Sequence, residues 1–412
     1  MARTQRWISF WTLGGVLLLH GPVCAQDPCG YEVAAIIKGP WCGDLLGFPP
    51  ITPTARDDSG AVAGFYSHCL FGPNAAFVWT SDGGLVTLDR PAGFTDARAW
   101  GLEGTTVVGS LWMNNLPNAA LWESGVSIQL GTPPAGNFSQ ALAIANGVII
   151  GNWGNNISGP GTRAFVWQDG EMIDLDLPMG PCTNASDING DGVITGWMGE
   201  AFFIGSHAYL WEDGVVVDLG VIPGGFTSWG RALNDLDPPQ VVGLGRIPQK
   251  GSQSAVWRAF LWNAGQMQDL GTLEGFLQSL ALDVNDPTEV VGAAFSSGQA
   301  AFIWRNGRMQ DLNDLLLGES GLVHISSAFA INNRGEIICE ATDMKGDGVA
   351  VLLVPATLTF ADLTCDGQVQ LDDFVALLDA WGPCNPGPCL ADLDDDGRVG
   401  IVDLLLLLAN WG

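Results

Sequence analysis

The chain has 412 residues, a length that accommodates two or three domains, and its 44 acidic and 16 basic side chains give a formal net charge of −28. So acidic a chain cannot pair with phosphates, which excludes nucleic acid and anionic membrane surfaces as partners. Charged residues make up only 15% of the sequence and apolar residues 47%, with 17 tryptophans, whereas disordered acidic chains are rich in charge and poor in aromatic residues. We therefore expect a folded chain of short apolar segments.

The first 25 residues have the organisation of a secretory signal peptide. Arg3 and Arg6 precede an apolar stretch from Trp7 to Leu19, and Ala25 ends a small-residue cleavage site. The stretch is too short to span a bilayer, and no other segment approaches ~18 uninterrupted apolar residues. We expect cleavage near Ala25, with the mature chain secreted or held at the cell surface; a buried first strand is the alternative. The eight cysteines of the mature chain permit disulfides but leave their pairing open.

Residues 26–357 are organised as a repeat of about 45 residues. An Ala-aromatic-x-Trp cassette or a close variant recurs at Trp79, Trp122, Trp167, Trp211, Trp262 and Trp304. An Ile-Asn-type turn and a Val-Val-Gly-type segment precede most cassettes, and a segment ending in Asp-Leu follows most of them. Each unit therefore reads as four short strands separated by turns.

Four strands in about 45 residues is the size of a β-propeller blade. Counting the Val-Val-Gly-type segments gives seven blades, which must stack because a single blade cannot bury both faces. The last unit lacks a fourth strand, and the segment Tyr31–Ile37 is a spare strand that we expect to complete it and close the ring. The expected fold is thus an all-β, seven-bladed propeller followed by a small α-helical domain; an extended β-solenoid is the alternative.

These cassettes resemble the HAF repeats of exported bacterial proteins, which combine Ala-Phe-x-Trp, Asp-Leu-Gly and Ile-Asn-x-x-Gly-x-Val-Gly elements. The resemblance covers residues 31–355. It implies a family but no particular activity.

One face of the propeller is predicted to carry long, variable loops, which follow the second and fourth strands of each blade and are where binding usually occurs. Five aromatic residues just after second strands are candidates for a rim that stacks on sugar rings: Tyr66, Trp112, Trp153, Trp197 and Phe295. The alternative is that these side chains fill the core.

Catalytic patterns are absent from the sequence: it contains no phosphate loop, nucleophile elbow or His-Glu-x-x-His motif. Glycosidases need only two carboxylates, and one aspartate recurs in four of the units (Asp174, Asp218, Asp269 and Asp311). We expect these aspartates to bond to backbone within their own blades.

Residues 361–412 hold ten aspartates and one arginine, with one pattern repeated at an offset of 30 residues. Acids at positions 1, 3, 5 and 12 with glycine at position 6 match a calcium loop of EF-hand type, in which the carbonyl of position 7 also coordinates the ion. The candidate ligands are Asp362, Thr364, Asp366, Gln368 and Asp373 in the first loop, and Asp392, Asp394, Asp396, Arg398 and Asp403 in the second. We expect two Ca²⁺ ions with dissociation constants on the order of 10⁻⁴ M or tighter, and helices over 374–380 and 404–410.

This pair looks like a type I dockerin domain, covering residues 358–412. The resemblance implies calcium binding and docking onto a cohesin module, or more loosely attachment to a surface scaffold. It departs at the hydroxyl pair that cohesins often recognise, which falls at Leu371-Asp372 and Ile401-Val402. A third candidate loop, Asp187–Gly192, has Met198 at position 12 and is better explained as a hairpin turn.

The leading hypothesis is an exported, non-catalytic binding or scaffold protein whose propeller binds a glycan or a protein and whose C-terminal module attaches it in a calcium-dependent manner. The first alternative is a polysaccharide-degrading enzyme, because dockerin-like domains commonly accompany glycoside hydrolases and lyases. The second is a purely architectural surface protein.

Overall fold

The computed structural model describes residues 30–40, 50–67, 73–155, 161–200, 205–249, 254–318, 320–356, 361–363, 368–384, 391–394 and 396–412. The predicted signal peptide, Thr364 and Asp366 lie outside these ranges. The described residues fall into two compact units, residues 30–356 and the C-terminal residues that follow. No helix among them is long and apolar enough to cross a membrane.

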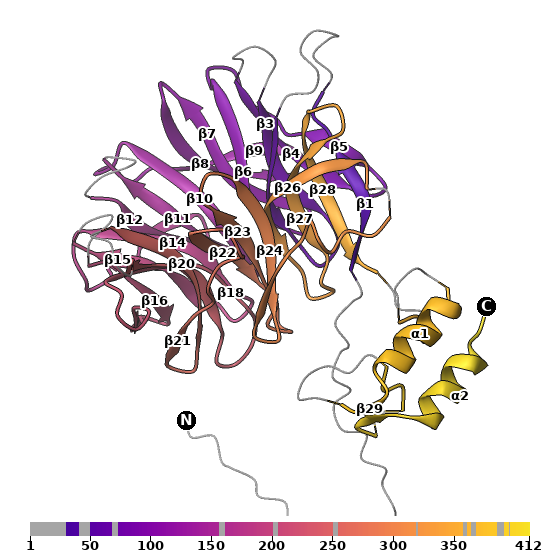
Figure 1. The fold of residues 1–412 in the computed structure, drawn as a ribbon. Coiled ribbons are helices and arrows are strands. Elements are labelled where there is room, and N and C mark those ends of the chain that lie inside the picture. The colour runs from indigo at the N-terminus through magenta and orange to yellow at the C-terminus, as the bar shows by residue number, and fades with distance from the viewer. Residues whose placement is uncertain are drawn as a thin grey trace, which may run out of the picture. The chain divides into compact units, whose positions relative to one another are not determined.

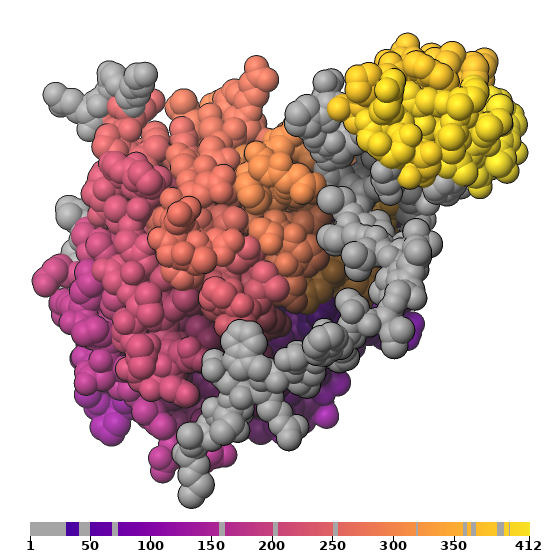
Figure 2. Space-filling model, turned by 90° about the horizontal axis from the view of Figure 1, so that it is seen from below, coloured from indigo at the N-terminus to yellow at the C-terminus, as the bar shows by residue number. Residues whose placement is uncertain are grey.

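The larger unit consists of seven four-stranded antiparallel sheets, six of which follow the chain order strictly (Figure 1). Blades one to three contain β2 (Ile51–Arg56), β3 (Val62–Ser67), β4 (Asn74–Thr80) and β5 (Gly84–Thr87), then β6 (Asp96–Glu103), β7 (Thr106–Met113), β8 (Leu116–Glu123) and β9 (Val126–Gly131), then β10 (Phe138–Ala145), β11 (Val148–Gly154), β12 (Arg163–Gln168) and β13 (Glu171–Asp174). Blades four to six contain β14 (Cys182–Ile188), β15 (Ile194–Gly199), β16 (His207–Glu212) and β17 (Val215–Gly220), then β18 (Thr227–Leu233), β19 (Val241–Pro248), β20 (Ala255–Asn263) and β21 (Gln266–Asp269), then β22 (Gln278–Val284), β23 (Val290–Phe295), β24 (Gln299–Arg305) and β25 (Arg308–Asp311). In the space-filling view the colours run around this unit in chain order (Figure 2).

The seventh blade joins the two ends of the unit. Its strands are β26 (Leu322–Ile331), β27 (Ile337–Asp343), β28 (Gly348–Pro355) and β1 (Tyr31–Ile37). Strand β1 pairs with β28 from Tyr31 opposite Pro355 to Ile37 opposite Ala350. The prediction of a seven-bladed propeller closed by its N-terminal strand is therefore confirmed.

Hydrophobic packing occurs between the blades, with a separate buried cluster at each of the seven junctions. The aromatic residues of the cassettes lie in these clusters, and Phe77, Phe165 and Tyr209 are fully buried. The cassette thus fills the space between neighbouring sheets, as predicted.

In blades one to six, the glycine of the Val-Val-Gly-type segment is required by the close approach of the first strand of the same blade. A Cβ atom at Gly151 would lie 1.9 Å from the carbonyl oxygen of Gln140, and one at Gly243 would lie 1.9 Å from that of Trp229. Both carbonyls belong to first strands that carry a β-bulge at this level. The bulge therefore explains why glycine recurs here.

Two faces of the propeller follow from the strand order. The turn face carries the tight turns between first and second and between third and fourth strands, and the loop face carries the other connections. Asp187–Gly192 forms a tight turn between β14 and β15, in which Asn189 accepts the Val193 N–H through its side chain at 2.9 Å. It is a hairpin, as expected.

The C-terminal unit contains α1 (Leu371–Asp379), α2 (Ile401–Ala409) and the short strands β29 (Gly382–Pro383) and β30 (Arg398–Val399). Both helices begin three residues before the predicted start. The cause is a cap: the Asp373 carboxylate accepts the Gln370 N–H at 2.8 Å, and Asp403 accepts the Gly400 N–H at 2.6 Å.

This unit has an internal two-fold relation at the 30-residue offset. Its core pairs Ala361 with Ala391, Val369 with Val399 and Leu377 with Leu407, all of them buried. Gly382 pairs with Val399 in a two-stranded sheet, and the Gly412 N–H donates to the Val369 carbonyl at 3.0 Å. Gly382, which follows α1, therefore contacts the end of the second loop, and Gly412, which follows α2, contacts the end of the first.

Candidate metal site and ligand-binding surfaces

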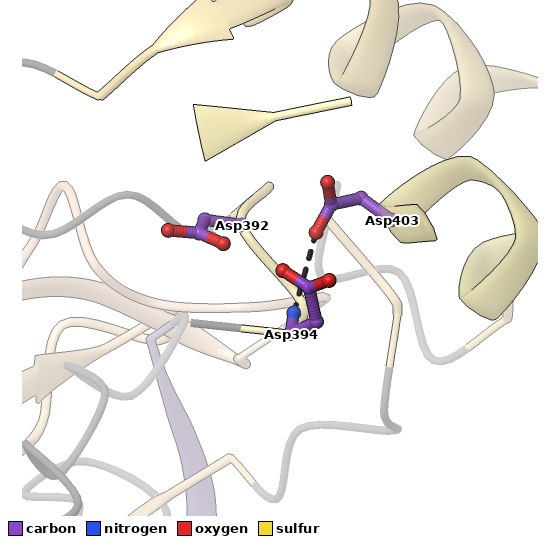
Figure 3. Close-up of side chains that lie close together, drawn as sticks. All are labelled: Asp392, Asp394 and Asp403. Carbon is purple, nitrogen blue, oxygen red and sulfur yellow. Dashed lines mark hydrogen bonds between the residues drawn. The ribbon is translucent and has the colours of Figure 1, made fainter. Parts of the chain in front are cut away.

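Three carboxylates of the second loop converge at the start of α2 (Figure 3). One oxygen of each of Asp392, Asp394 and Asp403 lies within 4.8 Å of the others. Asp403 reaches the loop from the first turn of α2, and its Oδ1 accepts the Leu393 N–H at 2.6 Å and the Asp394 N–H at 3.3 Å. These side chains are the predicted ligands of positions 1, 3 and 12, so the structure brings together what the sequence pattern indicates.

The carboxylates of the second loop are bonded by backbone N–H groups, which fix the loop conformation without neutralising the negative charge. Asp392 accepts the Asp396 N–H at 3.1 Å and the Gly397 N–H at 2.8 Å, and Asp396 accepts the Arg398 N–H at 2.8 Å. Partial desolvation raises the pKa of Asp394, and the charges of Asp396, Asp403 and Asp392 raise it further. Clustered carboxylate oxygens of this kind are the donors that a hard divalent cation prefers, so this cluster can hold a metal ion.

Within the described residues, the first loop has the same buried carboxylates as the second. Asp362 and Asp373 are 4% and 0% exposed, like Asp392 and Asp403 at 6% and 1%. Buried carboxylates are costly unless hydrogen-bonded or coordinated. The proposed ligands Thr364 and Asp366 lie outside the described residues, so their role stays a prediction.

Cys384 forms a disulfide bond. Cys182 and Cys339 are free and buried in the propeller. Burial raises the pKa of the Cys339 thiol, which favours an unreactive structural role.

The five predicted rim aromatics are placed differently from one another. Tyr66 and Trp197 are buried, at 2% and 4% exposure, so the core-filling alternative describes these two. Trp112, Trp153 and Phe295 are half-buried. Whether these three bind a ligand stays a prediction.

A larger aromatic cluster lies toward the loop face of blades four and five, and the sequence pattern points to two of its members, Trp197 and Phe226. Trp229 stacks on Trp197 at 5.6 Å between ring centroids and lies 5.0 Å from Trp257. The Arg246 guanidinium lies 5.3 Å from the Trp257 ring centre and 5.5 Å from that of Phe226, which is 38% exposed. The cluster combines flat apolar faces with a cation.

The recurring aspartates of the fourth strands cap turns within their own blades. The Oδ1 atoms of Asp174, Asp218, Asp269 and Asp311 each accept a backbone N–H two residues further on, at 2.8 Å. This structural role is the one predicted from their repetition.

The turn face is closed by hydrogen bonds that cross all seven blade junctions. Around the ring, the donors and acceptors are Gly104 N–H to Asp57 at 3.0 Å, Asn146 N–H to Glu103 at 2.6 Å, Asn146 Nδ2–H to Gly190 at 2.6 Å, Gly190 N–H to Asp235 at 2.7 Å, Asp235 N–H to Asp286 at 2.9 Å, Asp286 N–H to Asn333 at 2.9 Å and Asn333 N–H to Asp58 at 3.2 Å. This belt explains the recurring Asn and Asp residues of the tight turns. It also places carboxylates around the opening of the propeller axis.

Inside this belt lies a cavity of about 610 Å³, lined by the ends of all seven first strands. Asp187 and Asp283 line it from blades four and six. Each links its blade to the next: Asp187 accepts the Leu233 N–H at 3.1 Å, and Asp283 accepts the Ile331 N–H at 2.8 Å. Burial raises the pKa of both carboxyls to about 7, against the opposing effect of these bonds.

The raised pKa values predict that the propeller loses stability as pH rises. A carboxyl in the unfolded chain releases its proton near pH 4, whereas the folded one keeps its proton to about pH 7. The stabilisation that each protonated carboxyl gives the folded state is therefore complete below pH 4 and is lost as the pH passes 7. Between pH 5 and 7 the free energy of unfolding should fall by about 1.4 kcal/mol per pH unit for each group. When the free energy of unfolding is measured by urea at several pH values, its decrease per pH unit should be smaller by that amount in Asp283→Asn. The control Asp213→Asn, in an exposed turn, should keep the wild-type decrease. A decrease in Asp283→Asn equal to that of wild type would contradict the raised pKa.

Comparison with known proteins finds no matching family model and no matching curated protein. Among solved structures, the chain is similar to a puromycin-hydrolysing peptidase of Mycobacterium tuberculosis, at 12% identity over 79% of this chain and 55% of that chain, with a TM-score of 0.52. It is also similar to an acylaminoacyl peptidase of Pyrococcus horikoshii (11% identity, 74% and 51% coverage, TM-score 0.47) and to YCF48 bound to D1 peptide (12% identity, 78% and 96% coverage, TM-score 0.44). The chain spans about half the length of the two peptidases. At these identities the likeness shows a β-propeller fold alone.

Proposed function

We propose that this protein is an exported, non-catalytic binding protein whose C-terminal unit is a calcium-dependent, dockerin-like attachment module. The observation that carries the proposal is the duplicated loop-helix unit. In both halves an aspartate caps the helix, the carboxylates at positions 1 and 12 are buried, and the residue after the helix contacts the loop of the other half. The proposed ligand set combines carboxylates at positions 1, 5 and 12, Thr364 or Asp394 at position 3, and the carbonyl oxygen of Gln368 or Arg398. Bound calcium would neutralise carboxylates that otherwise repel one another.

The attachment surface that we propose consists of two equivalent apolar stripes, one on each helix. Their exposed members, with exposures, are Leu371 63%, Val375 47%, Leu378 45% and Trp381 48% on and after α1, and Ile401 61%, Leu405 59%, Leu408 48% and Trp411 47% on and after α2. Side chains at this spacing lie along one face of a helix. Exposed apolar stripes of this size are typical of protein interaction sites, and we propose a cohesin-like module as the partner.

The two-fold relation predicts that either stripe alone supports docking. Isothermal titration of the purified protein against a panel of type I cohesin modules should show calcium-dependent binding that EDTA abolishes. Val375→Asp and Leu405→Asp should each retain binding within about threefold, whereas the double variant should lose more than a hundredfold, because charged groups would then interrupt both apolar faces. The exposed Asp379→Ala is the control. Absence of calcium-dependent binding to every module, or full binding by the double variant, would contradict the proposal.

For the propeller, we propose glycan binding at the loop-face aromatic cluster. Support comes from the exposed Phe226 ring, the half-buried Trp257 and the Arg246 cation between them, since flat aromatic faces suit sugar rings and a cation suits acidic substituents. On a glycan array, Phe226→Ala should weaken the signal at least fivefold, whereas Ile128→Ala, an exposed change on β9, should not. A protein that binds no glycan, or a Phe226→Ala profile identical to wild type, would remove this part of the proposal.

The alternative of a polysaccharide-degrading enzyme would place a pair of carboxyls in the axial cavity, where Asp187 and Asp283 are found. The hydrogen bonds of these two carboxyls to neighbouring blades account for their positions without chemistry. Release of reducing sugar from plant or algal polysaccharide by the purified protein would favour the enzyme instead.

A further inference from the structure

The axial cavity is lined at one level by a ring of seven side chains, one from each blade. Each occupies the β-bulge of its first strand, where the register with the second strand skips a residue. The ring consists of Thr54, Trp100, Leu142, Ser186, Arg231, Leu282 and Phe329. Four of the seven are apolar or aromatic, two carry hydroxyls and one carries a positive charge.

Arg231 is the cation of this ring and lines the cavity. Its side chain is exposed although the blades surround it. Among the residues that the structure describes, none gives Arg231 a hydrogen bond or an ion pair. Elsewhere in the propeller Arg163 pairs with Asp174 and Arg334 with Glu336. An arginine left open inside a cavity is available for a ligand.

Two carboxyls of the cavity lining, from the blades on either side of Arg231, are already engaged. Asp187 and Asp283 direct both of their oxygens at backbone N–H groups, of Ile188 and Leu233 in one case and of Val284 and Ile331 in the other. Near neutral pH they are only partly ionised, because burial raises the pKa of each to about 7. Burial among the blades also lowers the pKa of Arg231 itself, and the hydrogen bonds of Asp187 and Asp283 go to backbone groups rather than to its guanidinium.

The cavity has the dimensions and lining of a small-molecule site. Ligand pockets commonly occupy about 300–1,000 Å³ and combine an apolar lining with a few placed polar groups, and this cavity has about 610 Å³. A planar guanidinium binds a carboxylate through two parallel hydrogen bonds. The belt carboxylates around the opening, among them Asp57, Glu103 and Asp286, disfavour ligands with several negative charges.

We propose that the axial cavity binds a small organic monocarboxylate, with Arg231 holding the carboxylate group and the ring formed by Trp100, Leu142, Leu282 and Phe329 enclosing its aromatic or aliphatic body. The described lining of this cavity includes no residue of the loop-face cluster or of the C-terminal unit. Failure of glycan or cohesin binding therefore does not bear on it.

Isothermal titration of the full chain at pH 6 with 3-phenylpropionate, hexanoate and indole-3-acetate tests the proposal. At least one probe should bind saturably, and its neutral amide should bind at least tenfold more weakly. Arg231→Gln should lose at least tenfold, which corresponds to about 1.4 kcal/mol, while Arg231→Lys, which keeps the charge but not the two-pronged geometry, should lose less. Arg308→Gln, an exposed change on β25, is the matched control.

Because Arg231 has no protein partner among the described residues, Arg231→Gln should melt within about 2 °C of wild type. A second measurement needs no variant: phenylglyoxal should modify Arg231 in the wild-type chain, as mapped by peptide mass, and the bound probe should slow that reaction. Absence of saturable binding by all three probes, equal binding by Arg231→Gln, or Arg231 modification that the bound probe does not slow would overturn the proposal.

Discussion

Removal of calcium is expected to unfold the C-terminal unit while the propeller stays folded. The unit has a small core, and without metal the carboxylates of Asp392, Asp394 and Asp403 repel one another at close range. At a calcium concentration of 100 times the dissociation constant, each site contributes about 2.7 kcal/mol. Two sites then supply about 5 kcal/mol, which is comparable to the whole stability of a small domain. Calorimetry should show two transitions in calcium, of which EDTA abolishes one.

The second loop can be tested by itself with Asp403→Asn. This change removes a carboxylate that belongs both to the acidic cluster and to the cap of α2, so the C-terminal transition should shift to lower temperature by roughly 15 °C while the first loop keeps its ion. Asp379→Asn, at the exposed end of α1, should leave both transitions in place. A C-terminal transition that is indifferent to EDTA and to Asp403→Asn would show that the fold of this unit does not depend on metal.

Loss of the closing strand is expected to have the largest effect on the propeller. Tyr31 is fully buried in the cluster between blades six and seven, its N–H donates to Leu315 at 2.8 Å, and its carbonyl accepts the Leu317 N–H at 3.0 Å. Tyr31→Ala should lower the free energy of unfolding by about 3–5 kcal/mol, as deletion of a large buried aromatic side chain does. Glu32→Ala, on the exposed side of the same strand, should change it by less than about 0.5 kcal/mol. Urea unfolding of the two variants makes the comparison.

A chain that begins at Lys38 lacks the whole of strand β1 and tests its role in closing the ring. Strand β28 would then present an unpaired edge, and exposed edges recruit strands from other molecules. We expect this truncated protein to associate in size-exclusion chromatography and to melt well below wild type. A monomer with wild-type stability would contradict the role of β1 as the strand that closes the ring.

The parts of this fold that the sequence predicts are those set by local repetition. The Ala-aromatic-Trp cassette and the Val-Val-Gly segment define the strands because both reflect packing that recurs in every blade. The closing role of Tyr31–Ile37 follows from counting strands, and the turn-capping role of Asp174 and its equivalents follows from their place at strand ends. These features can be predicted without knowing which residues of neighbouring blades are in contact.

Other features depend on contacts across blades, which a repeat pattern does not reveal. The burial of Tyr66 and Trp197 is set by neighbouring strands, and the stacking of Trp229 on Trp197 joins residues of blades five and four. Arg231 was not identified because a β-bulge breaks the alternation of the first strand. The early start of α1 and α2 was missed because Asp373 and Asp403 act as helix caps as well as proposed metal ligands.

We propose that both C-terminal loops bind calcium, and this property can be measured as the number of ions bound per chain. Native mass spectrometry of the purified full-length protein, titrated with Ca²⁺, should show two ions in wild type and one in Asp403→Asn, with dissociation constants on the order of 10⁻⁴ M or tighter. A protein that binds no Ca²⁺, or one in which Asp403→Asn leaves the count unchanged, would contradict the claim.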